Sequence, residues 1–448
     1  MTVARPRLRT VRPGQIVLLG FAVAILAGTA LLLLPIARAG PESPSFTTAL
    51  FTATSAVCVT GHVVVDTASY WSVFGQVVIM LLVQIGGFGI VTATTLIFTV
   101  FGRRLGLRGR LLTQAESQAL GGGDVRRVLA GVAIFTLTVE AVVAAVLTLR
   151  LHYGYDLALG DAVWRGVFHA VTAYNNAGFA LYRDNLMGFV ADWLVVVPIG
   201  FAVIVGALGY PVFVDLQRRR RGARTLTLHS KITLAGSGAL LLVGAVAYAV
   251  LEWTNERTLG ALPVHARVLE SWFMSLTPRT AGFNTLDISA LRDESWLVTD
   301  VLMFIGGGTG STAGGIKVAT FVVLVMIVMG EARGGRPAEV FQRTIPVPSQ
   351  RQALSVAFLA INAVVIATLA LLVVTPFPLE KCLFEVISAF STVGLSTGIT
   401  ADLGTAGEMI LVALMYVGRV GPLALVLALA QRERERLYAL PQEHPLIG

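Results

Sequence analysis

Long apolar stretches alternate with short polar segments along most of the chain. Windows without Asp, Glu, Lys or Arg cover residues 15–37, 67–102, 193–214, 232–251, 301–316 and 352–379. All but 301–316 reach the roughly 20 residues that a helix needs to cross about 30 Å of hydrocarbon. Stretches 128–149 and 409–431 are interrupted only by Glu140 and Arg419. The pattern predicts an all-α membrane protein with eight spans, near residues 15–37, 73–101, 128–149, 193–215, 232–251, 298–330, 352–376 and 409–431.

Composition agrees with this class. The 448 residues are 55% hydrophobic and 13% charged, whereas soluble proteins carry about 25% charged residues, so a water-soluble globular domain is excluded. Two cysteines, Cys58 and Cys382, and six scattered histidines argue against a disulfide framework and a metalloenzyme. The first apolar stretch follows a basic arm and lacks a small-residue cleavage site, so we interpret it as the first span and not as a signal peptide.

Basic residues predict the orientation in the plasma membrane. Segments on the side of both termini carry 23 Lys and Arg, and the opposite loops carry nine. By the positive-inside rule both termini are cytoplasmic. The run Arg218–Arg221 is explained by this same signal, and we expect no nucleic-acid partner. Acidic residues in the outer loops would concentrate cations there, although solvated loop charges alone would give the same pattern.

A short apolar segment that ends in a small polar cluster and a glycine occurs four times. The segments are 46–57, 162–174, 266–276 and 382–390, all too short to cross the bilayer, and the glycines are Gly61, Gly178, Gly282 and Gly394. A second glycine motif follows each of these by 25, 28, 25 and 24 residues, in 85–89, 205–209, 307–310 and 417–421. One GxxG alone would indicate close helix packing, but two motifs in step through four repeats indicate a fourfold architecture.

Re-entrant turns of this kind suit cation transport. Backbone carbonyls left unpaired at membrane depth are tolerated only inside protein or around a water-filled path. Four such turns on one axis would surround a dehydrated monovalent cation with carbonyl oxygens, and glycine permits the positive φ that this needs. The C-terminal, partly negative ends of the short helices would point to the same place.

The chain resembles the Trk/Ktr/HKT superfamily of potassium transporters, most closely its KtrB-type membrane subunits, over nearly its whole length. The resemblance implies repeats at 1–101, 102–218, 219–331 and 332–431, a cytoplasmic tail at 432–448, and a potassium-selectivity filter made by four short segments. These segments are Cys58, Val59, Thr60 and Gly61; Asn175, Asn176, Ala177 and Gly178; Arg279, Thr280, Ala281 and Gly282; and Ser391, Thr392, Val393 and Gly394.

Two details refine this expectation. Plant members with serine in the first repeat tend to favour sodium, so Gly61 implies potassium. None of the four segments keeps the Tyr-Gly that completes the potassium-channel TVGYG loop, so we expect fewer well-formed ion sites. His62 follows the first glycine; we expect its ring to face bulk water, and a pH-sensing role is a minor alternative.

The sixth span is interrupted by a glycine-rich segment that disfavours a regular helix. In the family, the matching segment is an intramembrane gating loop beneath the filter. Here it comprises Gly306, Gly307, Gly308, Thr309, Gly310, Ser311, Thr312, Ala313, Gly314, Gly315 and Lys317. A Walker A loop is excluded, because Ile316 stands where lysine is needed. Arg419, inside the eighth span, either pairs with this loop, as the resemblance implies, or forms a structural ion pair, for example with Glu140. Glu140 is assigned no transport role.

Three function classes were compared. The first is a potassium-conducting subunit gated from the cytoplasm. The second is a secondary transporter with alternating access, which predicts inverted or twofold repeats. The third is a membrane-embedded enzyme, which would need convergent catalytic groups that the spans lack. The resemblance also implies a homodimer that lies among membrane lipids and binds a cytoplasmic ring of KtrA-type regulatory subunits. The nucleotide, ATP or ADP, would bind only to that partner, and activation by Na⁺ stays open. The tail at 431–436 is either a docking surface or a solvated helix end.

Overall fold

The structure is a computed structural model that describes residues 13–104, 125–223 and 225–430. The basic arm at 1–12 and the tail at 431–448, including the predicted docking segment, lie outside the described residues. Nearly all regular structure in the described part is helical. The named strands, β1 (Glu339–Val340) and β2 (Arg343–Thr344), form a small antiparallel hairpin in which Glu339 pairs with Thr344.

The helices occur in four successive groups, and the second helix of each group, which covers one of the four short apolar segments, is called its short helix. The first group is α1 (Pro13–Leu32), α2 (Phe46–Val57), α3 (Thr67–Tyr70) and α4 (Val73–Arg104); the second is α6 (Val125–Tyr155), α7 (Leu159–Asn175), α8 (Trp193–Leu208) and α9 (Tyr210–Arg220). The third is α10 (Leu228–Glu252), α11 (Val264–Leu276), α12 (Asp293–Phe304) and α13 (Val318–Ala332), and the fourth is α14 (Val347–Val374), α15 (Leu379–Phe390) and α16 (Gly404–Ala430). Single 3-10 turns lie at Pro35–Ala37, Met187–Phe189, Leu259–Ala261, Ile288–Ala290 and Thr400–Asp402.

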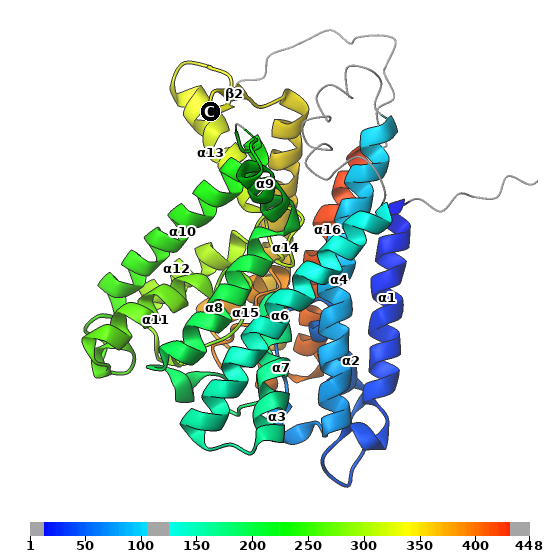
Figure 1. The fold of residues 1–448 in the computed structure, drawn as a ribbon, viewed down its shortest axis with the longest axis vertical. Helices are drawn as coiled ribbons and strands as arrows, with labels where there is room; N and C mark the ends of the chain where they lie inside the picture. Colours follow the sequence, from blue (N-terminus) through cyan, green and yellow to red (C-terminus); the bar gives the residue numbers. More distant parts are fainter. Residues whose placement is uncertain (1–12, 105–124, 224, 431–448) are drawn as a thin grey trace, which may run out of the picture.

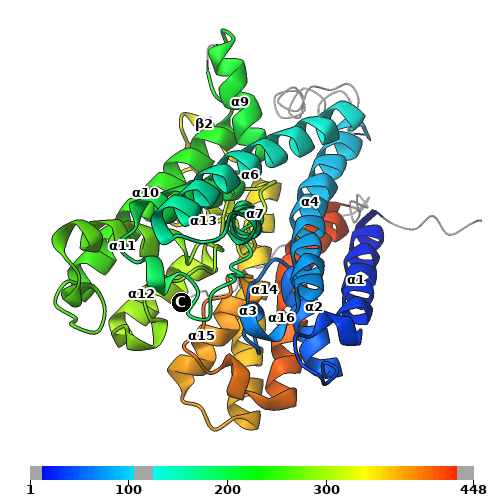
Figure 2. The same ribbon diagram turned by 60° about the horizontal axis from the view of Figure 1, so that its bottom comes forward.

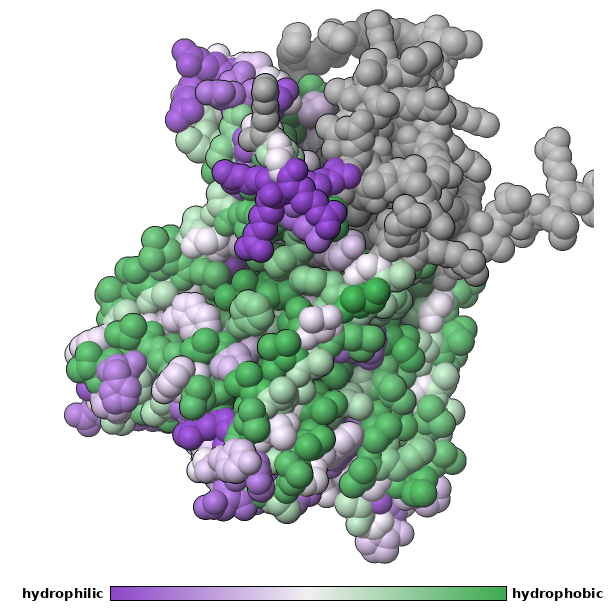
Figure 3. All heavy atoms as spheres, viewed as in Figure 1, coloured by the Kyte–Doolittle hydropathy of each residue, from purple (hydrophilic) through white to green (hydrophobic). Residues whose placement is uncertain are grey.

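The surface supports a membrane protein. Figure 3 shows a broad hydrophobic band around the middle of the molecule and hydrophilic side chains gathered toward its two ends. By length and composition, four helices of the described residues can each cross a bilayer, namely α4, α6, α10 and α14, and α8 with α9 make a fifth if the bent pair is one span. The apolar helices α1 and α13 are shorter. The predicted all-α membrane fold is confirmed.

One predicted span is not continuous. We expected a single helix over 193–215, but the chain bends by 91° between α8 and α9. Gly209 at the bend has φ +86°, a conformation that favours glycine. Pro211 follows near the start of α9 and cannot donate a backbone hydrogen bond to Ala207. The break therefore has a local cause, and it leaves carbonyls at the end of α8 without helical partners.

The four groups close into a ring. One helix that follows the short helix of each group packs against the short helix of the next group, in the pairs α4 with α7, α8 with α11, α12 with α15, and α16 with α2. Figure 2 shows the groups arranged in sequence order around a common centre. The ends of the described chain, at the start of α1 and the end of α16, lie at the same end of the molecule as α9 and the β-hairpin (Figure 1). The short helices therefore meet in the middle of the protein.

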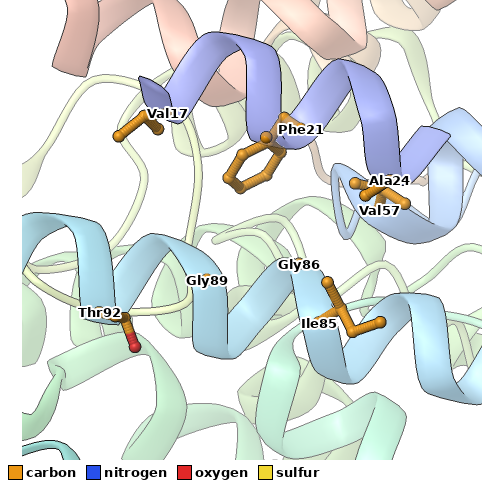
Figure 4. A pocket seen from close by; sticks show the side chains of 9 residues that line it. Val17, Phe21, Ala24, Val57, Ile85, Gly86, Gly89 and Thr92 are labelled. Atoms are coloured by element: carbon orange, nitrogen blue, oxygen red, sulfur yellow. The ribbon is translucent and has the colours of Figure 1, made fainter. Parts of the chain in front are cut away.

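An apolar hollow of about 240 Å³ lies at the side of this ring, between α1 and α4. Phe21 extends from α1 toward α4 beside Gly86 and Gly89, and Val57 contributes from α2 (Figure 4). Thr92 is the one polar residue among the nine that line it. A lining of this kind offers little to solvate a cation, so a hydrophilic route must lie elsewhere.

Candidate functional site

Each short helix ends in a turn with the same unusual backbone. The residue two positions before each predicted filter glycine has positive φ: 57° at Val59, 60° at Asn176, 74° at Thr280 and 51° at Thr392. Three of these four are β-branched, for which this conformation is strained by about 1–3 kcal/mol. Such strain is retained mainly where function requires the backbone geometry.

Hydrogen bonds show how these turns terminate their helices. The Thr60 N–H donates to the Ser55 carbonyl at 2.8 Å, and matching bonds link Val393 to Ser388 at 2.9 Å and Ala177 to Thr172 at 2.8 Å. This six-to-one bond, with a left-handed residue beside it, is the Schellman type of helix end. The last carbonyls of a helix have no donor within it. The four helix ends thus present oxygen atoms close to the filter glycines.

The four glycines form a closed ring of backbone contacts. A Cβ atom added at Gly61 would come within 3.0 Å of the Ala177 carbonyl oxygen of the second repeat. A Cβ atom at Gly178 would lie 2.8 Å from the Cα atom of Gly282 in the third repeat. A Cβ atom at Gly282 would collide with the Val393 carbonyl oxygen of the fourth repeat, and one at Gly394 with the Thr60 carbonyl oxygen of the first. Each glycine therefore touches the backbone of the next repeat, and the fourth returns to the first. The predicted filter segments share one axis, with main-chain oxygens between them.

Hydroxyl groups in the same segments lack partners. Within the described residues, the side-chain oxygens of Thr60, Thr280, Ser391 and Thr392 are buried and make no hydrogen bond. Buried polar groups in proteins are almost always paired. These four hydroxyls are thus available to bind a group other than the side chains and backbone around them.

Two other polar side chains of the filter segments, Arg279 and Asn175, reach surrounding helices. Arg279 donates two hydrogen bonds of 3.0 Å to Ser237 on α10, one to its carbonyl and one to its hydroxyl. Asn175 donates to Gln84 on α4 at 2.8 Å and to Glu140 on α6 at 3.2 Å. These two residues thus anchor the filter segments from behind, and only their backbone can contribute to the ring. Cys58 is fully buried.

The expectation for His62 was wrong. Its side chain does not face bulk water but is 1% exposed, with Nδ1 3.6 Å from the carboxylate of Glu385. The residue directly after a filter glycine is enclosed here because α15 of the fourth repeat packs beside the first.

The predicted gating segment is a closed loop between α12 and α13. Its ends are paired, since Gly306 N–H donates to the Ile316 carbonyl at 2.8 Å and Val318 N–H to the Gly307 carbonyl at 3.1 Å. Residues 306–316 are buried, apart from the half-buried Thr309. The expected interruption of the sixth span is therefore present, as an ordered loop inside the protein.

The broken end of α8 holds this loop. The Ala207 carbonyl, which Pro211 cannot reach with a hydrogen bond, accepts one from Gly308 N–H at 2.8 Å, and the Gly206 carbonyl accepts one from Thr312 N–H at 3.3 Å. The Thr312 hydroxyl donates to the Tyr174 carbonyl at 3.3 Å. The bend in the second repeat thus supplies acceptors for a loop of the third.

The loop also touches the filter itself. The Thr312 hydroxyl and the Asn176 amide are hydrogen-bonded at 3.2 Å. A Cβ atom at Gly314 would come within 3.0 Å of Ser391 and Thr392. The loop therefore lies directly against filter residues of the second and fourth repeats.

Two basic side chains lie on the other side of the loop. Arg419 Nη1 donates to the Thr312 carbonyl at 2.5 Å, and Lys317 Nζ donates to the carbonyls of Ala313 and Gly314. The proposed ion pair with Glu140 is not formed, because Glu140 contacts Asn175 instead. Arg419, Lys317 and the loop line a cavity of about 510 Å³.

The sequence is similar to those of known cation transport proteins. A family model described as TrkH, a cation transport protein, matches residues 21–438. The chain belongs to the TrkH family of cation transport proteins. Its relatives include Ktr system potassium uptake protein B of Bacillus subtilis, 39% identical over 95% of this chain and 94% of the relative, and its counterpart from Vibrio alginolyticus, 37% identical over 97% and 94%. The potassium/sodium uptake protein NtpJ of Enterococcus hirae is 34% identical over the whole of both chains.

The fold of a TrkH-family transporter is matched as well. The crystal structure of the potassium transporter TrkH from Vibrio parahaemolyticus superimposes with a TM-score of 0.74, covering 95% of this chain and 86% of that one at 17% identity. The predicted resemblance is confirmed. The family consists of transport proteins and not enzymes, so the membrane-embedded enzyme is set aside.

Some residues that hold the predicted filter segments were not anticipated. The Ser55 hydroxyl accepts from Gly61 N–H at 3.1 Å, and that of Ser388 accepts from Gly394 N–H at 3.1 Å. Both serines stand six residues before the glycine, a spacing that the repeat alignment contains and that could have revealed them. The role of Pro211 had no such signal, because its consequence lies in a loop that is about 100 residues away in sequence.

Proposed function

We propose that this protein is the membrane subunit of a potassium-uptake system. K⁺ would pass along the axis of the four filter segments, coordinated by main-chain oxygens of residues 58–61, 175–178, 279–282 and 391–394. The observation that carries this proposal is the closed ring of contacts between each filter glycine and the backbone of the next repeat. Carbonyl oxygens arranged around an axis can replace the hydration shell of an alkali ion. The names of the relatives, potassium uptake proteins, agree with this substrate.

The loop at 306–317 would act as the gate. It lies against residues of the proposed filter, carries Lys317 and accepts a hydrogen bond from Arg419 of α16, so an ion leaving the filter would meet buried backbone and two positive charges. Displacement of the loop would open the path to the cavity beneath it. A cytoplasmic nucleotide-binding partner would drive this displacement, as the Ktr system of the relatives suggests, and the subunit would act as a homodimer with both termini in the cytoplasm.

Alternating access remains the competing mechanism, but the ring favours a channel-like path. Four groups packed in sequence order around one axis differ from the two-part arrangement of most rocking transporters. No feature of the described residues specifically favours the second mechanism.

Gly61→Ser tests the filter assignment. At φ +87° a side chain is strained, and its Cβ atom would collide with the Ala177 carbonyl oxygen. In cells that lack their own potassium uptake, we expect the variant to lose most K⁺ uptake or its preference for K⁺ over Na⁺. Gly238→Ser on α10 is the matched control, because no atom lies within 4 Å of a Cβ there. Uptake of unchanged rate and selectivity in Gly61→Ser would refute the assignment.

A further inference from the structure

A buried histidine and carboxylate lie at the junction of the first and fourth repeats. His62 directly follows Gly61, and Glu385 lies on α15, the short helix of the fourth repeat. His62 Nδ1 is 3.6 Å from Glu385 Oε2, and both side chains are 0% exposed. Because these repeats come from opposite ends of the chain, the two residues lie where the ring closes.

Glu385 is tied to the segment that follows the fourth filter glycine. Its carboxylate accepts hydrogen bonds from the Ser396 hydroxyl at 2.5 Å, the Thr397 N–H at 3.0 Å and the Thr400 hydroxyl at 2.8 Å. One oxygen also faces His62. The carboxylate thus holds the segment after the fourth filter glycine and lies against the residue after the first.

A hydrogen bond holds the backbone of His62, whereas its ring nitrogens make none to the described residues. The Ser55 hydroxyl that accepts from Gly61 N–H also donates to the His62 carbonyl at 2.8 Å. Among the residues that the structure describes, neither ring nitrogen of His62 has a hydrogen-bond partner. His169 of the second repeat differs, because its Nδ1 lies 2.7 Å from the Arg165 carbonyl and its Nε2 accepts from Leu181 N–H at 3.2 Å. Hydrogen bonds therefore fix the ring of His169, whereas the ring of His62 has the Glu385 carboxylate as a charged neighbour at 3.6 Å.

The pair changes the charge beside the filter when it takes up one proton. With a neutral imidazole and an ionised carboxylate, its net charge is −1, and one added proton makes it zero, whichever residue carries it. The other titratable group near the carboxylate is Cys382, one turn earlier on α15, whose thiol contacts the Phe377 carbonyl and the Thr375 hydroxyl. The remaining contacts of Glu385 are hydroxyls and an amide, which do not offset its charge.

We propose that His62 and Glu385 form one proton-binding unit that positions Gly61 against the fourth repeat and couples the potassium affinity of the filter to external pH. The negative form favours a cation on the axis and the protonated form weakens its binding. Apparent affinity therefore falls as the outside becomes acidic. This inference rests on the proposed function, since it concerns the same path.

The experiment measures Rb⁺ uptake by the full-length protein in liposomes, with internal pH fixed and external pH varied from 5.5 to 8.0. For the unaltered protein we expect the KM for Rb⁺ to rise at least threefold toward pH 5.5, with a smaller change in maximal rate. Glu385→Gln should show the high KM at every pH. His62→Gln should retain a pH response with its midpoint moved to lower pH, because glutamine offers no proton site and its amide stabilises the carboxylate.

His152→Gln is the matched control. This histidine lies near the end of α6, with Nδ1 2.8 Å from the Leu157 carbonyl, and its substitution should leave the profile unchanged. The inference is overturned if the KM of the unaltered protein is constant across the range, or if His62→Gln keeps the unaltered midpoint. The unaltered protein and His62→Gln decide the matter even if Glu385→Gln does not fold. Absence of any Rb⁺ uptake at all pH values would instead refute the proposed function.

Discussion

Arg419 offers the sharpest test of the gate. Arg419 is a residue of α16, and its guanidinium donates to the Thr312 carbonyl at 2.5 Å. The hydrogen bond therefore links the fourth repeat to the loop of the third. A hydrogen bond to a charged group contributes about 1.5–3 kcal/mol. Since about 1.4 kcal/mol corresponds to a factor of ten, Arg419→Ala should shift the loop toward its open state by about 10- to 100-fold.

The assay is Rb⁺ flux into liposomes that contain the protein without any cytoplasmic partner. Arg419→Ala and Arg419→Met should both raise this basal flux, up to the limit set by the open path, and Arg419→Lys should stay nearer the unaltered rate because it keeps the charge. Arg38→Ala is the matched control: Arg38 pairs with the exposed Glu42 at 3.2 Å, and such surface pairs contribute about 0–1 kcal/mol. A basal flux in Arg419→Ala no higher than in this control would refute the assigned role.

Two smaller changes test the supports of the gate and the filter. Pro211→Ala gives α9 a backbone N–H that competes with Gly308 for the Ala207 carbonyl. We therefore expect a several-fold rise in basal flux, smaller than that of Arg419→Ala. An unchanged flux would mean that the bend does not hold the loop. Ser55→Ala removes the hydrogen bond from Gly61 N–H, and such a bond contributes about 1 kcal/mol. In competition uptake the preference for K⁺ over Na⁺ should therefore fall about fivefold, with the protein still folded. Full selectivity would contradict the anchoring role.

The fold class and much of the candidate site could be predicted from local patterns. Apolar stretches long enough to cross a bilayer indicate membrane helices whatever their neighbours are. The glycine after each short helix could be found because a positive φ places a demand on a single residue. The loop between α12 and α13 could be predicted for a similar reason, since the many glycines in 306–315 disfavour a helix locally.

Positions that depend on a partner from another repeat could not be predicted. His62 was expected to face water, but its side chain is buried and lies against Glu385 on α15, more than 300 residues later in the chain. Arg279 was placed in the filter, and its side chain instead reaches Ser237 on α10. The break in the span over 193–215 has local causes in Gly209 and Pro211, but no local feature shows that backbone N–H groups of the loop at 306–317 donate to the carbonyls that the bend releases.

By itself, the amino-acid sequence determined which segments enter the membrane, where four short helices stop, and which stretch cannot be a regular helix. The physical reason is that hydropathy and backbone freedom are properties of single residues and short windows. Only the tertiary structure decided which carbonyls and side chains meet at the centre. Contacts such as Gly394 with Thr60, or Arg419 with Thr312, join residues from distant parts of the chain, and they exist only because four groups of helices pack into a closed ring.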